Sequence, residues 1–155
     1  MKEGMAIFCP NANSYRRFQP GFFAPITPNW GPNHRNLSLR IPLSDSENVR
    51  IEHRAAGADA NPYLVMASVL SGIHYGLKNE VSPPTMISEG EVIGPEVTLP
   101  VKWHEALEAF SQAEVLPQYL SKEYCEVFHK CRSCEMDRFT SQISNKDFEW
   151  YLRSI

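Results

Sequence analysis

The chain has 155 residues, a formal net charge of -3 and a hydrophobic fraction of 43%. This length allows one domain with a buried core, and the slightly acidic balance argues against a domain that mainly holds nucleic acid. No apolar run approaches the length of a membrane-spanning helix, and no secretory signal pattern follows the N-terminus. We therefore expect a cytoplasmic protein with reduced cysteines and with neither a nucleic-acid nor a membrane partner.

Residues 1–60 are rich in Pro, Asn, Gly and Arg, which predicts loops and short strands. The prolines between Ala24 and Pro32 exclude a helix there, because each removes a backbone donor and clashes with the preceding turn. Aromatic side chains such as Phe22 and Trp30 are interleaved with them and favour an ordered loop over disorder.

Two segments alternate between apolar and polar residues, Asn36–Ile41 and Val49–Arg54, and predict two half-buried strands. The polar residues between them predict an antiparallel hairpin. A hairpin symmetric about residue 45 would place Arg40 opposite Arg50. His53 falls on the face opposite the charged residues, where we expect it to pack rather than to bind a ligand.

The charged face of the second strand is the first candidate site. Arg50, Glu52 and Arg54 point the same way, and Arg40 is expected to join them, with Ser38 opposite Glu52. Guanidinium groups bind phosphate and carboxylate with matching geometry, and a carboxylate among them can hold a hard cation such as magnesium. A solvated face with salt bridges is the simpler alternative, and the pattern alone leaves it open.

Residues 61–155 are predicted to be mainly helical. Asn61 is a good N-cap before Pro62, and Met66, Val69 and Ile73 follow helical spacing, so we expect them in the core.

Three further helices are expected toward the C-terminus. One begins at Trp103 and ends at Pro117, one is capped by Ser121, and a short one contains Phe148. The predicted fold class is α+β, with antiparallel strands and ordered loops in residues 1–60 followed by covering helices in residues 61–155. A zinc or redox role for Cys131 and its neighbours is disfavoured, because the spacing would leave tetrahedral zinc short of ligands.

Several stretches together resemble motifs of the glutamine synthetase family, in the order and spacing of that family. They are Asn13–Gly21, Asn33–Pro42, Arg50–Arg54 and Gly57–Leu64. The last residues, Glu149–Leu152, look like the C-terminus of the gamma-glutamylpolyamine synthetase branch. The resemblance covers essentially the whole chain and corresponds to the C-terminal portion of the catalytic domain.

The resemblance implies an ATP-dependent ligase that converts glutamate into gamma-glutamyl phosphate, which an amine then attacks. Glu52 would be a ligand of Mg²⁺ or Mn²⁺, and Arg17 and Arg54 would hold the carboxylates of glutamate. Arg35 and Arg40 would contact the phosphates of ATP, and Arg40 would also stabilise charge during phosphoryl transfer. Complete members of the family form homo-oligomeric rings.

Phe23 departs from the family pattern in an informative way. Ammonia-using members carry a glutamate at this position, which helps to form the ammonium site. A phenyl ring excludes water but cannot attract ammonium or take its proton. The departure favours a larger organic amine, such as putrescine or another polyamine. An ammonia-using glutamine synthetase is the first alternative, and a non-catalytic remnant that binds anions or a family subunit is the second.

A second departure concerns the metal ligands. Complete members carry most of their metal-binding glutamates, and a histidine, before the first of these motifs, so the resemblance implies that this chain lacks them. One carboxylate is too few to hold the metal ions, and we expect the chain alone to have no ligase activity.

Overall fold

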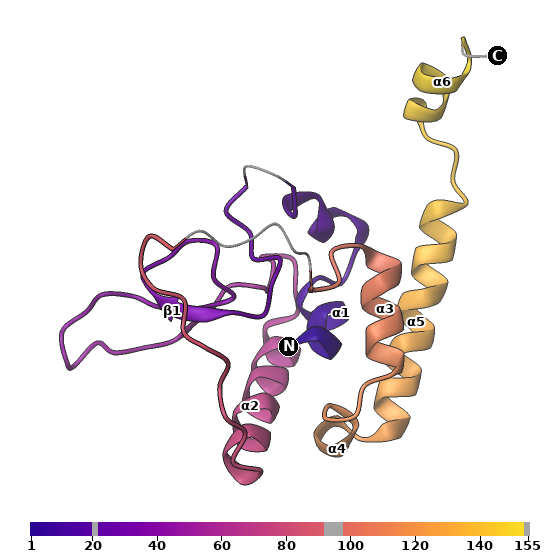
Figure 1. Cartoon of the computed structure of the whole chain (residues 1–155). Helices are drawn as coiled ribbons and strands as arrows, with labels where there is room; N and C mark the ends of the chain where they lie inside the picture. The colour runs from indigo at the N-terminus through magenta and orange to yellow at the C-terminus, as the bar shows by residue number, and fades with distance from the viewer. Residues whose placement is uncertain (20–21, 92–97, 154–155) are drawn as a thin grey trace.

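The computed structural model describes residues 1–19, 22–91 and 98–153, and it shows an α+β fold in which a small sheet adjoins several helices (Figure 1). The expected fold class is confirmed. The end of the first motif, Pro20-Gly21, and part of the predicted linker, residues 92–97, lie outside the described residues. The elements in chain order are η1 (Lys2–Gly4), α1 (Met5–Phe8), η2 (Ala12–Arg17), β1 (Trp30–Pro32), β2 (Leu39–Ile41), β3 (Glu52–His53), α2 (Pro62–Lys78), α3 (Trp103–Ser111), α4 (Pro117–Leu120), α5 (Lys122–Thr140) and α6 (Asn145–Tyr151).

The short helix α1 forms the centre of the core. Every residue from Met5 to Cys9 is at most 3% exposed. In Figure 1 this helix lies between α2 and α3. Only loops and strands were expected in this segment, because a helix of four residues is too short to show a helical period. The buried residues that pack with α1 are Tyr15, Ala55, Leu99, Trp103, Ala106, Leu107, Phe110, Leu116 and Cys125.

A single carboxylate fastens the N-terminal segment to the helical part. Glu3 accepts hydrogen bonds from the backbone N–H groups of Glu114 (2.9 Å), Val115 (3.2 Å) and Leu116 (3.0 Å). These donors lie just before α4, where backbone N–H groups lack intrahelical partners. The contact holds residues far apart in the chain against each other.

The sheet is mixed and has the order β1-β2-β3. Strand β1 pairs in parallel with β2 although its residues were expected in a loop, and β2 pairs antiparallel with β3. The predicted register was wrong by two residues, because Arg40 lies opposite Glu52 and not opposite Arg50. The turn at Asp45, whose side chain accepts from the backbone N–H of Asn48 at 3.1 Å, shifts the centre of the hairpin. The observed register sets opposite charges face to face, whereas the predicted one would oppose two arginines.

Burial follows the predicted alternation only in part. Leu37 is fully buried as expected, but Ser38 is fully buried as well. The backbone oxygen of Ser38 accepts from the backbone N–H of Arg54, so Ser38 does not lie opposite Glu52 as predicted. Val49 and Ile51 were expected on a buried face and are 68% and 67% exposed. Ile51 only lines an open hollow together with residues such as Trp30 and Pro83.

The helix starts agree well with the sequence. Asn61 caps α2 by accepting from the backbone of the next turn, and Ser121 caps α5 in the same way. The terminal helix α6 is also confirmed, and Figure 1 shows it beyond the end of α5, away from the other elements. Pro117 does not end the helix that begins at Trp103. Helix α3 already stops at Ser111, and Pro117 occupies the first turn of α4.

The predicted core face of α2 was largely wrong. Met66 and Ile73 are 58% and 52% exposed, and only Val69 packs against the core. The buried positions of this helix are Ser68 and Ser71. No described helix is long and apolar enough to cross a membrane.

His53 packs against the core as predicted, with its ring centroid 4.4 Å from that of Phe8. Burial lowers the pKa of His53 to about 4. Between pH 6.5 and pH 4, His53 therefore stays largely neutral in the folded chain, whereas in the unfolded chain its imidazole takes up a proton.

Folding stability should consequently fall as the pH drops through this window, with a His53 contribution of up to about 3 kcal/mol. Urea unfolding at pH 7, 5.5 and 4 measures the effect. His53→Leu should remove this part of the slope, whereas the same change at His104, exposed on α3, should leave it. Equal slopes for both variants would contradict the assignment.

Candidate active site

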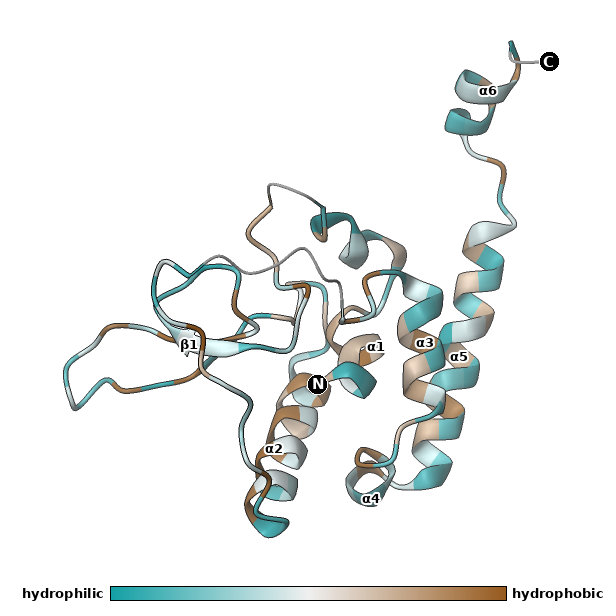
Figure 2. Cartoon of the chain, in the orientation of Figure 1, coloured by the Kyte–Doolittle hydropathy of each residue, from teal (hydrophilic) through white to brown (hydrophobic). Residues whose placement is uncertain are grey.

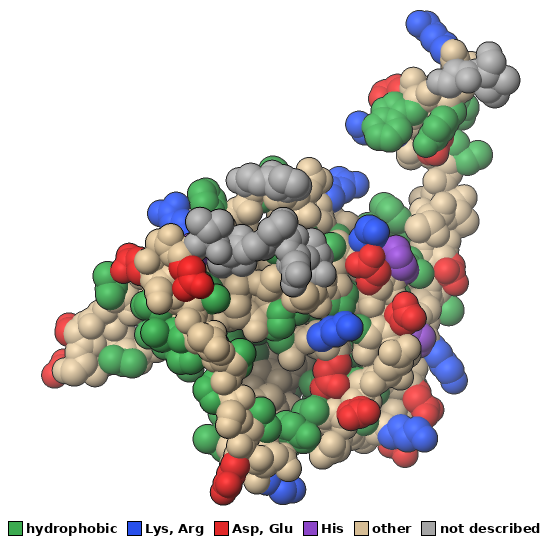
Figure 3. Space-filling view, viewed as in Figure 1, with side chains coloured by type: hydrophobic (Ala, Val, Ile, Leu, Met, Phe, Trp, Pro, Cys, Tyr) green, Lys and Arg blue, Asp and Glu red, His purple; other side chains and the backbone are tan. Residues whose placement is uncertain are grey.

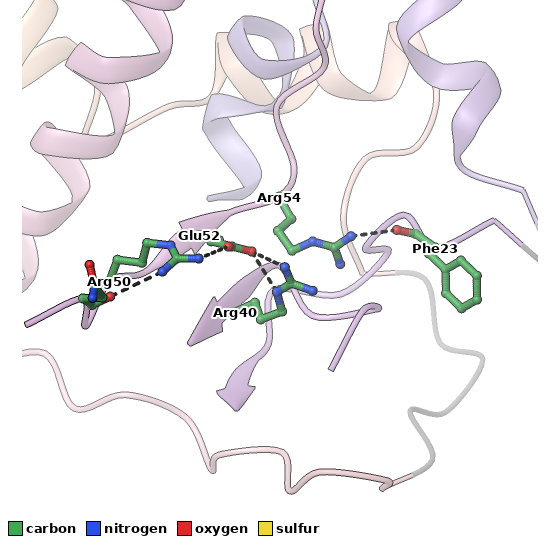
Figure 4. A network of polar contacts seen from close by, with 6 residues as sticks. Phe23, Arg40, Arg50, Glu52 and Arg54 are labelled. Carbon is green, nitrogen blue, oxygen red and sulfur yellow. Dashed lines mark hydrogen bonds and ion pairs between the residues drawn. The ribbon is translucent and has the colours of Figure 1, made fainter. Parts of the chain in front are cut away.

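Glu52 lies at the centre of a cross-strand network (Figure 4). Its Oε2 accepts from the Nε of Arg40 at 2.8 Å and lies 2.6 Å from the Nη2 of the same guanidinium. Its Oε1 lies 3.4 Å from the Nη2 of Arg50. The hydrogen bond from Arg40 lowers the pKa of the Glu52 carboxyl, with help from the charges of both arginines. The carboxylate is therefore ionised at neutral pH and engaged at both oxygens.

Arg54 extends the positive face beyond this network. Its Nη2 donates to the backbone oxygen of Phe23 at 3.3 Å, while its Nη1 is buried and has no hydrogen-bond partner among the described residues. Burial and then the charge of Arg40 lower the pKa of Arg54, and the charges of Arg17 and Arg35 act in the same direction. A buried unpaired donor surrounded by like charges favours the binding of an anion.

Phe23 is part of the same surface. The guanidinium carbon of Arg35 lies 5.6 Å from the centroid of the Phe23 ring, within the range of a cation–π contact. The ring is 62% exposed. The residue that departs from the family pattern therefore lies between two of the arginines assigned to substrates, Arg35 and Arg54.

Arg17 approaches from the side of the core. Its Nη2 donates to the backbone oxygen of Ala55, the residue after Arg54, and lies 3.9 Å from the Sγ of Cys9. Its Nε is buried and, within the described ranges, has no partner. Burial raises the pKa of the Cys9 thiol to about 11, so the thiol is neutral and does not compensate the guanidinium. Arg17 is near the strand but does not join the Arg40–Glu52 pair.

Asp59 places the helix that carries Arg17. Its Oδ2 accepts from the Nδ2 of Asn11 at 2.9 Å and from the Oγ of Ser14 at 2.7 Å. Asn11 in turn caps η2, and the Oγ of Ser14 accepts a hydrogen bond from the backbone N–H of Asn11 at 3.2 Å, which completes a reciprocal capping box. The loop after β3 is thus tied to the start of η2. This role of Asp59 was not predicted, although the spacing of Asn11 and Ser14 is a recognisable helix-start signal.

The structure brings the predicted site residues together to different degrees. Ion pairs join Arg40, Arg50 and Glu52, and Figure 4 shows Arg54 beside them. Arg35 is connected to the site by its cation–π contact with the ring of Phe23, whose backbone oxygen accepts from Arg54. Within the described ranges, no three His, Cys, Asp or Glu side chains are grouped so that they could hold a metal ion. Glu52 therefore fits a metal site only as one ligand among several, and the functional roles of these residues stay predictions.

The chain matches the family model "Glutamine synthetase, catalytic domain" over residues 1–151. It is 43% identical over 155 residues to gamma-glutamylputrescine synthetase PuuA of Escherichia coli (strain K12), covering 99% of this chain and 33% of that protein. It is 32% identical over 158 residues to a glutamate–isopropylamine ligase of a Pseudomonas species, covering 99% of this chain and 34% of that protein.

Solved structures agree with these relatives. The structure of GmaS without ligand matches with a TM-score of 0.81 and 27% sequence identity, over 98% of this chain and 35% of that chain. The chain therefore spans about a third of the length of the relatives it matches.

The Asp59 contacts lead to a stability prediction. Asp59→Ala leaves the donors of Asn11 and of the buried Ser14 without their acceptor, which should cost about 1–3 kcal/mol of unfolding free energy. Asp59→Asn keeps one acceptor oxygen and should cost less. Urea unfolding measures both, with Asp137→Ala on the exposed side of α5 as the matched control. A loss no larger than that of the control would show that Asp59 does not fasten η2.

Proposed function

The chain belongs to the glutamine synthetase catalytic-domain family, and we propose that it supplies the C-terminal portion of the active site of a glutamate–amine ligase. The observation that carries the proposal is the surface around Glu52. Its ionised carboxylate is held by Arg40 and Arg50. Nearby, Arg17 and Arg54 each have a buried guanidinium nitrogen with no hydrogen-bond partner in the part of the chain that the structure describes. Such a surface suits a reaction in which phosphate and carboxylate groups must be bound together.

The arginines divide into two groups under this proposal. Arg35 and Arg40 bind the phosphates of ATP, and Arg40 stabilises the negative charge that develops during phosphoryl transfer. Arg17 and Arg54, whose unpaired guanidinium nitrogens are buried, bind the carboxylates of glutamate.

The proposed reaction has two steps. A gamma-carboxylate oxygen of glutamate attacks the gamma-phosphorus of ATP, and ADP leaves. The amine nitrogen then bonds to the acyl carbon, phosphate leaves with the electrons of the broken C–O bond, and the nitrogen gives up one proton to solvent or to the leaving phosphate.

Glu52 is proposed to be one ligand of a divalent ion, Mg²⁺ or Mn²⁺, that the complete site holds. The donor chemistry fits, because a hard cation takes oxygen ligands and often uses few carboxylates. When bound, the ion neutralises phosphate charge. With the ion bound, Arg40 would share Glu52 with it through its Nε and Nη2 and keep its remaining guanidinium nitrogen for the phosphate.

The proposal that the amine substrate is a polyamine rests on Phe23. The side chain at this position is apolar, exposed and covered on one side by Arg35, so it offers no carboxylate to an ammonium ion. The relative from E. coli is named for putrescine, which agrees with a polyamine substrate for this chain. A glutamine synthetase that uses ammonia is the weaker candidate for the same reason. A homo-oligomeric ring and a cytoplasmic location stay predictions.

A chimera tests the proposal. The third of E. coli gamma-glutamylputrescine synthetase that this chain matches is exchanged for the chain, and product formation from ATP, glutamate and either putrescine or ammonia is followed by mass spectrometry. The chimera should form gamma-glutamylputrescine, whereas the 155-residue chain alone should show no turnover. A chimera that folds and makes no gamma-glutamyl amide would overturn the proposal, and turnover by the chain alone would overturn the dependence on further metal ligands.

Phe23→Glu in the chimera tests the choice of amine. The new carboxylate should shift the ratio of kcat/KM toward ammonia by at least about tenfold, which corresponds to about 1.4 kcal/mol. Phe22→Glu is the matched control, because Phe22 and Phe23 are 61% and 62% exposed. A ratio that responds equally to both changes would contradict a specific role for Phe23.

A further inference from the structure

We propose that the outward side of α2 is a docking surface for the part of the catalytic domain that this chain does not contain. We call this surface the α2 outer face. It consists of five large apolar side chains, which are 84%, 58%, 55%, 52% and 76% exposed: Tyr63, Met66, Leu70, Ile73 and Leu77.

The spacing of these residues makes one continuous stripe. They recur alternately three and four positions apart, which is the pattern of a helix seam that packs against a partner. From Tyr63 to Leu77 the stripe runs along about 21 Å of the helix. It contains no charged side chain before Lys78.

The opposite side of α2 is already occupied. Ser68 and Ser71 are buried there, and Leu64, Val65 and Val69 pack against the core. A helix that is apolar all round is typical of a helix covered on both sides. Among the described residues only one side is covered, and Figure 2 shows hydrophobic residues recurring along α2, with hydrophilic residues at its C-terminal end. Figure 3 shows hydrophobic side chains at the surface in the region that α2 occupies.

A second apolar feature lies soon after α2 in the sequence. A hollow of about 340 Å³ is lined mainly by Trp30, Leu39, Ile41, Ile51, Pro83 and Pro84. The Nε1 of Trp30 donates to the backbone oxygen of Pro84 at 2.8 Å, which holds the segment after α2 against the sheet. An occupant with apolar side chains therefore suits both features.

The lengths of the relatives identify the occupant. E. coli gamma-glutamylputrescine synthetase contains a segment 43% identical to this whole chain, inside a protein of which the chain covers 33%. The partner proposed for the α2 outer face is the remaining polypeptide of such a catalytic domain, whether joined to the chain or separate. An anionic membrane suits the surface poorly, because basic residues do not flank the stripe on its N-terminal side.

This inference rests on family membership and not on the amine or on any catalytic step. It is tested by binding, so its failure is distinguishable from failure of the proposed ligase activity. The chain is co-expressed with the part of E. coli gamma-glutamylputrescine synthetase that lies outside the match, and the mass and affinity of the purified complex are measured. The proposal predicts a one-to-one complex.

A double variant, Leu70→Glu with Ile73→Lys, should weaken this complex at least about tenfold. The two new side chains form a favourable pair along the helix, so the fold of the chain should be retained, which circular dichroism verifies. The matched control is Val127→Glu with Cys131→Lys on the exposed side of α5. Equal weakening by both variants would overturn the proposal, as would the absence of a complex with a soluble complement.

Oxidation of Met66 by peroxide provides a second measurement that needs no separate complement. The Met66 thioether should react readily in the isolated chain and at least about tenfold more slowly in the chimera described above. Undiminished reactivity in the chimera would overturn the proposal. Protection that appears in the isolated chain as its concentration rises would assign the surface to a second copy instead, and would overturn it as well.

Discussion

The ion pair between Arg40 on β2 and Glu52 on β3 is the contact on which the arrangement of the site depends. It sets opposite charges directly across an antiparallel pair and so favours the observed register. A slip by one residue would turn every side chain of β3 to the other face, sending Glu52 into the core and His53 to the surface. The pair also keeps Glu52 ionised, because the pKa of the carboxyl is lowered by the hydrogen bond from Arg40.

The core supplies the platform for this hairpin. The ring of His53 packs on Phe8, and the backbone N–H of Gly57 donates to the backbone oxygen of Phe8 at 2.9 Å. Asp59 then fastens η2, so that Arg17 reaches the backbone oxygen of Ala55 just after the strand. Several arginines are thereby held close together against their mutual repulsion. An anion that binds to these arginines reduces their repulsion and stabilises the folded arrangement further. A site for phosphate and carboxylate groups requires this property.

Local signals were the parts of the fold that the sequence could predict. The N-caps Asn61 and Ser121 depend on neighbouring residues only, and both helices begin where expected. The helix α1 was missed because it is too short to show a period, and the hairpin register was missed because it depends on a cross-strand charge pair. Exposure of the α2 outer face was missed for a different reason. Its stripe is typical of a helix face that packs, but nothing among the described residues covers it. For the candidate site, the motifs identified the charged face, while the contact of Asp59 with Ser14 depends on the tertiary fold.

The central proposal is that Glu52 is a metal ligand within a completed site. The most direct measurement is Mn²⁺ binding to the chimera by equilibrium dialysis, comparing Glu52→Gln with Glu47→Gln in the exposed loop before β3. We predict that Glu52→Gln lowers the affinity of one Mn²⁺ site per subunit at least about tenfold, whereas Glu47→Gln leaves the affinity of all sites unchanged. Unaltered binding by the Glu52 variant would contradict it, and Glu52 would then serve only to pair with the arginines.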